Sequence, residues 1–268
     1  MSLTPNSLPE INPLGPTPEA APPSISEDPP WTGWDVLQIA VLTLVATFVL
    51  VLVVTLGAQH LLYPRKAIID VAKFPLVTIV AQVLAYGFVL AFMVAIVKNK
   101  SHRSFSDAIQ WNRPDNWAPN FFGGVVLSFG LQGIAHLVPI PKELPMDRFF
   151  QTTGEAWALA VFGVTLAPLL EELFFRGFLY PVLVRRAGVT IAIVLTAAGF
   201  SLIHAPQLGK AWGPVLVIFL VGLVLTFVRA KTKSVAAGVV MHVAYNGTIS
   251  ALLFVATDGF RHLEKLNQ

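Results

Sequence analysis

The chain has no cysteine among its 268 residues, and charged residues make up only 12% of it. The lack of cysteine excludes disulfides, thiolate catalysis and zinc sites built on cysteine. The basic residues are scattered between apolar runs rather than gathered in a patch, so we expect no nucleic-acid partner. Hydrophobic residues reach 55% and the mean hydropathy is +0.69, which is far from the balance of a soluble domain. The composition therefore predicts an integral membrane protein.

Apolar runs recur at about the length of 20 residues that a helix needs to cross the hydrocarbon core of a bilayer. They predict an all-α fold, a polytopic helical membrane bundle of about seven transmembrane helices. The runs cover 34–58, 74–97, 118–140, 156–184, 189–205, 212–230 and 234–256. Tryptophan belongs at the headgroup level of a membrane, and several runs begin near one: Trp31, Trp34, Trp117, Trp157 and Trp212.

The composition also divides the chain into segments. Residues 1–33 are rich in proline and contain acids but no lysine or arginine, and they lack the basic start and apolar core of a signal peptide. We expect a disordered tail there. Residues 34–150 would hold the N-terminal transmembrane helices, with an amphipathic surface helix at 98–117. Residues 151–256 would form a transmembrane core with buried polar groups, followed by a C-terminal tail at 257–268.

The orientation in the membrane is weakly determined by the sequence. Basic residues are divided almost evenly between the two sets of alternate loops, so the positive-inside rule gives no clear choice. The loops at 185–186 and 229–233 have the densest positive charge. This density favours a cytoplasmic location for those two loops.

Three charged residues, Glu171, Glu172 and Arg176, lie inside an otherwise apolar run. A charge at the centre of a bilayer costs about 2.5–3.5 kcal/mol on insertion scales. Glu172 and Arg176 are spaced i,i+4 with the acid first, which favours an ion pair on one helix face. Glu171 points about 100° away and has no local neutralising partner. The spacing predicts a structural or supporting role for Glu172 and Arg176 and a functional role for Glu171. Pro168 should kink this helix.

Two later runs carry further polar groups. Phe200 and His204 are spaced i,i+4 and share one face, as do His242 and Asn246. Each has a structural alternative: a histidine can be a hydrogen-bonded core residue, and an asparagine often only joins helices in a membrane. Their joint occurrence with Glu171 favours function.

These residues could hydrolyse an amide bond. An apolar setting makes a carboxylate a stronger base, so Glu171 could activate a water molecule that His204 holds from the other side. His242 and Asn246 could donate hydrogen bonds to the oxyanion. Alternatively, Glu171, His204 and His242 could bind a zinc ion with one open position. The spacing does not decide between these possibilities, because the residues belong to different helices.

The three motifs together resemble the CPBP intramembrane protease family. They are Glu-Glu-x-x-x-Arg at 171–176, Phe-x-x-x-His at 200–204 and His-x-x-x-Asn at 242–246. This family groups the type II CAAX-prenyl endopeptidases with bacterial bacteriocin-processing and immunity proteins. The resemblance covers roughly 156–250, so that residues 151–256 would be a CPBP-like catalytic core.

The resemblance implies a membrane-embedded endopeptidase, with a membrane-associated, CAAX-like or lipidated protein or peptide as substrate. By it, Glu171 and His204 activate water, His242 and Asn246 stabilise the oxyanion, and Glu172, Arg176 and Phe200 support the site. The family was named as metalloproteases although a metal-free mechanism has been argued, so zinc stays open as a cofactor. We expect the membrane of a bacterial cell, with lipid as a partner. The alternative function is a non-catalytic scaffold, immunity factor or transporter that uses the same polar cluster for binding.

Overall fold

The computed structural model describes residues 28–139, 141, 145, 152–209 and 211–263. Helices and turns account for all the structure in these ranges, and no strand occurs in them. The main elements are α1 (Gly33–Leu61), α2 (Ile68–Val71), α3 (Pro75–Lys100), α4 (Phe105–Ala108), α5 (Ala118–Ala135), α6 (Thr153–Val164), α7 (Leu166–Glu172), the π-helical segment η2 (Leu173–Leu179), α8 (Tyr180–Ala187), α9 (Val189–His204), α10 (Trp212–Thr232) and α11 (Val235–Ala256).

The predicted all-α membrane bundle is confirmed, and each of the seven apolar runs contains helix within the described residues, although α5 ends at Ala135. Within the described residues, five segments are long and apolar enough to cross a membrane: Gly33–Leu61, Pro75–Lys100, Thr153–Ala187, Trp212–Thr232 and Val235–Ala256. Helix α9 is a shorter apolar helix. Helix α5 has 18 residues and includes Asn120 and Gln132, and it is not among the five.

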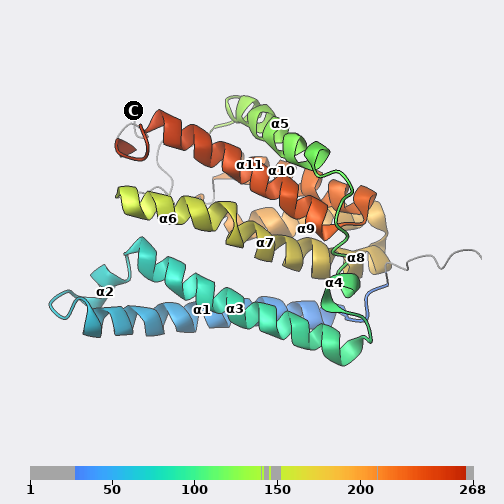
Figure 1. The fold of residues 1–268 in the computed structure, drawn as a ribbon, viewed down its shortest axis with the longest axis horizontal. Coiled ribbons are helices and arrows are strands. Elements are labelled where there is room, and N and C mark those ends of the chain that lie inside the picture. The colour runs from blue at the N-terminus through green and yellow to red at the C-terminus, as the bar shows by residue number, and fades with distance from the viewer. Residues whose placement is uncertain (1–27, 140, 142–144, 146–151, 210, 264–268) are drawn as a thin grey trace, which may run out of the picture.

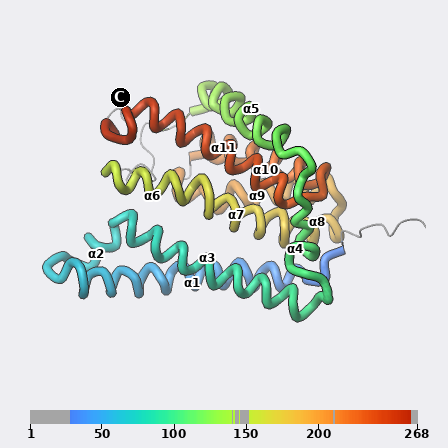
Figure 2. The backbone as a smooth tube through the Cα atoms, in the orientation of Figure 1, coloured from blue at the N-terminus to red at the C-terminus, as the bar shows by residue number. Residues whose placement is uncertain are grey.

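The long helices are arranged in layers (Figure 1). The α1 and α3 helices pack along each other, and the run from α6 through α8 crosses the middle of the molecule beside them. Helices α11 and α5 cover the other side, and α9 and α10 pack together behind the middle layer. The tube in Figure 2 shows the same order and shows that α6 and α7 are not collinear. The middle run therefore has neighbours on several sides.

The middle run is broken once and changes helix type once before it reaches α8. Thr165, with φ −115° and ψ −75°, separates α6 from α7. Pro168 then lies in the first turn of α7, where a missing amide hydrogen costs least. This break agrees with the kink that Pro168 predicts. The next seven residues form η2, in which Tyr180 N–H bonds to the carbonyl of Phe175. π-Helical turns inside α-helices occur frequently at functional sites.

The prediction of an amphipathic surface helix at 98–117 is wrong. Helix α3 continues to Lys100, and the segment then forms only the single turn α4, which Ser104 caps. Ile109 is buried in the core, and the carbonyl of Gln110 accepts a hydrogen bond from the amide of Val235. The segment turns inward because its apolar residue packs against the bundle instead of a lipid surface.

The last residues of the predicted disordered tail, 28–33, are ordered and packed against the bundle. Trp31 is completely buried, its Nε1–H donates to the carbonyl of Phe178 at 3.0 Å, and the two rings stack at 4.5 Å between centroids. Arg185 donates to the carboxylate of Asp28 and to two backbone carbonyls next to it. Trp31 is thus a core residue and not a headgroup anchor. The rest of the predicted tail, 1–27, lies outside the described residues, as do 264–268.

Candidate functional site

Arg176 occupies the centre of the bundle and forms the ion pair that its spacing from Glu172 predicts. Its Nη1 lies 2.7 Å from Oε1 of Glu172, and neither side chain is exposed. The guanidinium also donates to the hydroxyl of Thr226 at 3.2 Å and to the carbonyl of Gly222 at 3.0 Å, both on α10. These partners satisfy most of the donors of a charge that is fully removed from water.

Glu172 joins this ion pair to α11. The same Oε1 atom lies 3.0 Å from Nδ1 of His242. The other oxygen, Oε2, has no hydrogen-bond partner in the described part of the chain, and it packs against Gly238. A Cβ atom at residue 238 would lie only 2.6 Å from that oxygen. Glycine at this position therefore allows the carboxylate to approach the helix.

Glu171 lies between two histidines from different helices. Its Oε1 is 3.8 Å from Nε2 of His204, and its Oε2 is 3.7 Å from Nε2 of His242. Both distances exceed the range of a direct hydrogen bond, so there is room for a bridging atom. The side chains of Glu171 and His204 retain 16% and 17% exposure, whereas that of His242 retains 4%. The site is therefore largely buried but still accessible to solvent.

The orientation of His204 is set by the backbone of its own helix. Its Nδ1 lies 2.8 Å from the carbonyl of Phe200 one turn earlier. A carbonyl can only accept, so Nδ1 carries a proton in this contact and Nε2 is directed to Glu171. The i,i+4 spacing that the sequence shows therefore fixes the tautomer as well as the face.

Phe200 forms an aromatic wall beside these groups. Its ring contacts those of His204 and His242, with centroid distances of 4.9 and 5.7 Å. The guanidinium carbon of Arg176 lies over the same ring at 4.7 Å, which is a cation–π distance. Phe200 has 2% exposure, so it contributes packing and not solvent contact.

Asn246 lies one turn beyond His242 on α11. Its Nδ2 donates to the carbonyl of Gly163 at 2.7 Å, close to the end of α6. One amide hydrogen of Asn246 is used in this contact, and a carboxamide has a second. The side chain therefore also ties α11 to the end of α6.

The predicted alternative for these side chains is a zinc site formed by Glu171, His204 and His242. Across the described residues, no three histidine, aspartate or glutamate side chains are placed so that they could hold a metal ion as they stand. Glu171, His204 and His242 approach one another, but they do not form such a group in this conformation.

Three residues of the site were not predicted from the sequence: Thr226 and Gly222, which bind Arg176, and Gly238, which contacts Glu172. Each is a small or hydroxyl residue in an apolar helix. Such residues are typical of close helix packing in membranes. Nothing in their spacing indicates which distant charge they contact.

The fold and the site together define an integral membrane protein that holds a cluster of ionisable side chains within its helical bundle. Residues 152–248 match the family model described as type II CAAX prenyl endopeptidase Rce1-like. The chain thus carries an Rce1-like domain, which supports its assignment to the CAAX-type membrane proteases. The matched range contains every residue of the predicted site. Comparisons with curated proteins and with solved structures gave no match.

Proposed function

We propose that the protein is an intramembrane endopeptidase that hydrolyses a peptide bond of a membrane-associated protein or peptide. The observation that carries this proposal is the position of the Glu171 carboxylate, with one histidine nitrogen near each of its oxygens, at 3.8 and 3.7 Å. A base must lie within reach of the proton that it removes, directly or through one water. A water molecule between these groups would meet this condition.

In the proposed reaction, the Glu171 carboxylate removes a proton from a water molecule that Nε2 of His204 helps to hold. The water oxygen bonds to the carbonyl carbon of the substrate, and the negative charge moves to the carbonyl oxygen. His242 and the second amide hydrogen of Asn246 donate to this oxygen. The C–N bond then breaks, and Glu171 returns its proton to the leaving nitrogen. The products are a carboxylic acid and an amine, and the carboxylate of Glu171 is regenerated.

Glu172 and Arg176 support this reaction without contact with the substrate. The carboxylate of Glu172 holds Nδ1 of His242 at 3.0 Å, and Arg176 neutralises that carboxylate at 2.7 Å. When the ring carries protons on both nitrogens, His242 donates Nδ1–H to Glu172 and Nε2–H to the oxyanion. The orientation of His242 in this proposal therefore depends on the buried ion pair.

The place of the site and the family model support the proposed substrate class. Glu171 belongs to the helical run Thr153–Ala187, which is long and apolar enough to cross a membrane. A peptide must therefore be held at the membrane by its own apolar or lipidated part to reach the carboxylate. The family model carries the words CAAX prenyl endopeptidase, so a prenylated C-terminal peptide is the first substrate to test. We place the protein in the membrane of a bacterial cell.

The test uses the purified full chain in lipid vesicles. Two quenched fluorescent peptides end in the same CAAX sequence, and only one carries a farnesyl group on its cysteine. We expect the wild-type chain to cleave at least one peptide and Glu171→Gln to cleave neither, because glutamine keeps the size of the side chain and removes its basic oxygen. Glu155→Gln, in the first turn of α6, is the matched control and should cleave like the wild type.

Mass spectrometry of the products locates the cleaved bond. Cleavage of the farnesylated peptide alone would assign the lipidated substrate class. Normal cleavage by folded Glu171→Gln would refute the proposed mechanism. Saturable peptide binding by the wild type without any cleavage would instead support the non-catalytic function.

A further inference from the structure

The π-helical segment η2 contributes two side chains that support the candidate site. Arg176 forms the ion pair with Glu172, and Glu172 in turn holds Nδ1 of His242 at 3.0 Å. The ring of Phe175 packs edge-on against that of Phe200, with 5.3 Å between the centroids. A change between π-helical and α-helical form would rotate each residue of η2 about the helix axis. The directions of Arg176 and Phe175 therefore depend on the form of η2.

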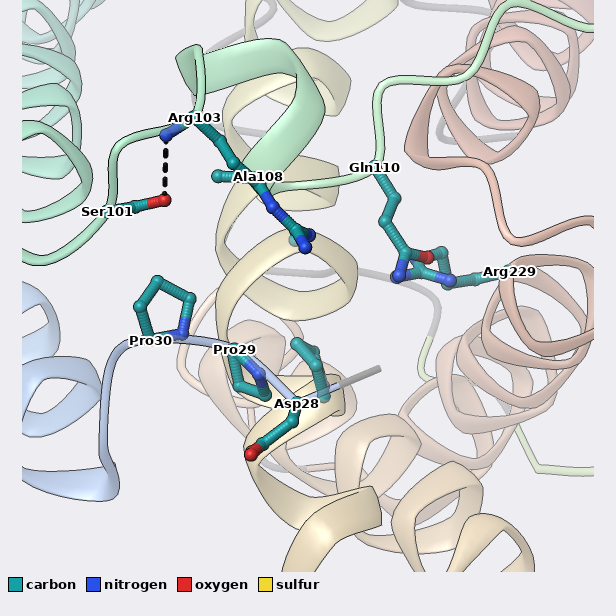
Figure 3. A pocket seen from close by; sticks show the side chains of 10 residues that line it. Asp28, Pro29, Pro30, Ser101, Arg103, Ala108, Gln110 and Arg229 are labelled. Atoms are coloured by element: carbon teal, nitrogen blue, oxygen red, sulfur yellow. Dashed lines mark hydrogen bonds between the residues drawn. The ribbon is translucent and has the colours of Figure 1, made fainter. Parts of the chain in front are cut away.

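Packing does not surround η2 on every side. A cavity of about 250 Å³ lies against Gly177, and its lining also includes Asp28, Pro29, Pro30 and Arg229. In Figure 3, Asp28, Pro29 and Pro30 lie on one side of this cavity and Arg229 lies on the other. The π-helix is also a rare form that appears mostly as single turns inside α-helices. The segment therefore depends on specific contacts to keep its form.

Two side chains donate hydrogen bonds to backbone carbonyls of η2. The Nε1–H of Trp31 donates to the carbonyl of Phe178 at 3.0 Å, and the Nε–H of Arg229 donates to the carbonyl of Arg176 at 3.3 Å. A carbonyl oxygen has two lone pairs, so it can accept such a bond in addition to a helical one. Positions 176 and 178 are two residues apart, so their carbonyls lie on nearly opposite sides of the helix. The two donors thus hold η2 from both sides.

The indole of Trp31 is itself held in place. It has no exposure to solvent, and its ring stacks on that of Phe178 with 4.5 Å between the centroids. Arg185 donates to the carbonyls of Pro29 and Trp31 at 3.0 and 3.1 Å and pairs with Asp28 at 2.7 Å. Residues 28–31 are therefore attached to the end of α8 as well as to η2.

We propose that Trp31 is a positioning residue for the candidate site. Its N–H holds η2 in the form in which Arg176 reaches Glu172 and Glu172 directs His242. Trp31 acts through η2 and not through contact with the substrate. It lies outside the range 152–248 that matches the family model. The kinetic consequence rests on the proposed proteolytic function, whereas the consequences for η2 and His242 do not.

The first experiment measures hydrogen exchange by mass spectrometry on the purified full chain in a neutral detergent. Trp31→Phe keeps an aromatic ring against Phe178 and removes the N–H. The backbone amides of 173–180 should then exchange about two- to tenfold faster, the range expected for the loss of one hydrogen bond, while those of α9 exchange as in the wild type. Trp34→Phe is the matched control, because Trp34 is 66% exposed and should leave exchange unchanged.

A second measurement follows the site itself. In nuclear magnetic resonance spectra of protein with isotope-labelled histidine, the His242 signal, assigned with His242→Gln, should move in Trp31→Phe and not in Trp34→Phe. In the peptide assay, Trp31→Phe should lower kcat at least about twofold with KM unchanged, because the contact of His242 forms mainly in the transition state. If the wild type cleaves no peptide, the proteolytic function fails, and exchange and the His242 signal still decide the role of Trp31.

A surface variant tests the same proposal without a change in the core. The side chain of Arg185 is 34% exposed, and Arg185→Gln releases the segment that holds Trp31. It should also speed exchange in 173–180, whereas Arg186→Gln, at the next residue of α8, should not. The proposal is overturned if Trp31→Phe and Trp34→Phe give the same exchange and the same His242 signal. It is also overturned if exchange rises equally in η2 and α9, or if Arg185→Gln and Arg186→Gln act equally.

Discussion

The side chains of Glu172 and Arg176 meet at 2.7 Å in the centre of the bundle, and neither retains any exposure to solvent. Burial of two charges has a large desolvation cost, which their mutual attraction repays only when other hydrogen bonds complete the set. Here Arg176 has two further acceptors on α10, and Glu172 has one further donor on α11. This ion pair therefore joins η2 to two neighbouring helices.

The first prediction concerns the stability that depends on this ion pair. Arg176→Ala should destabilise the protein by roughly 3–5 kcal/mol, because it leaves the carboxylate of Glu172 buried without a countercharge. Glu171→Gln should have little effect, since its side chain retains 16% exposure and has no such partner. Melting temperatures of the purified variants test this difference. Equal melting temperatures would show that Arg176 is not needed to neutralise Glu172.

A second prediction concerns Gly238. Gly238→Ala places a Cβ atom 2.6 Å from Oε2 of Glu172, so the carboxylate must move away from its present contacts. Overpacking of this kind costs about 1–3 kcal/mol, and activity should fall because His242 loses its partner. The matched control is Gly247→Ala on the same helix, where the new Cβ would meet Val164 at an ordinary 3.6 Å. Melting temperature and peptide cleavage measure both effects. A harmless Gly238→Ala would contradict this account of the contact.

The third prediction separates two roles of Asn246. If its second amide hydrogen stabilises the oxyanion, Asn246→Ala should lower kcat about 10²–10³-fold, the usual cost of one such donor. KM should change little, because this contact forms mainly in the transition state. Thr248→Ala, on the same helix, is the control. An unchanged kcat with a lower melting temperature would show that Asn246 serves only to tie α11 to the carbonyl of Gly163.

The fourth prediction concerns metal. We expect chelator-treated protein to keep its activity, because the proposed reaction uses only the carboxylate of Glu171 and the neighbouring side chains. Metal analysis should then find substoichiometric zinc, and the melting temperature should not change, since a tightly bound ion would stabilise the folded state. Loss of activity that zinc restores and magnesium does not would reverse this prediction. Glu171, His204 and His242 would then be the ligands.

Much of the fold could be predicted from the sequence because a membrane constrains each helix separately. A run such as 212–230 must be apolar along its length and satisfy its own backbone, so its composition nearly determines its structure. The helix Trp212–Thr232 is close to that prediction. The i,i+4 contacts between Glu172 and Arg176 and between Phe200 and His204 are local in the same sense. The helical repeat of 3.6 residues per turn brings both residues of each pair to one face, so these contacts do not depend on other helices.

Two predictions were wrong: the amphipathic surface helix at 98–117 and the disorder of the residues directly before α1. In both segments, distant parts of the chain bury an apolar residue. Ile109 packs into the core, and Trp31 stacks on Phe178, which lies 147 positions later. Composition does not show which partner removes a residue from water.

By itself, the sequence determined the helical membrane class, the ion pair and the residue types of the candidate site. Only the tertiary structure decided that Glu171 faces His204 and His242, that Gly238 admits Glu172, and that Trp31 donates to a carbonyl of η2. The physical reason is that helical periodicity fixes the direction of a side chain on its own helix. The contacts between helices depend on which helices are neighbours and at what depth, and those are properties of the packed bundle.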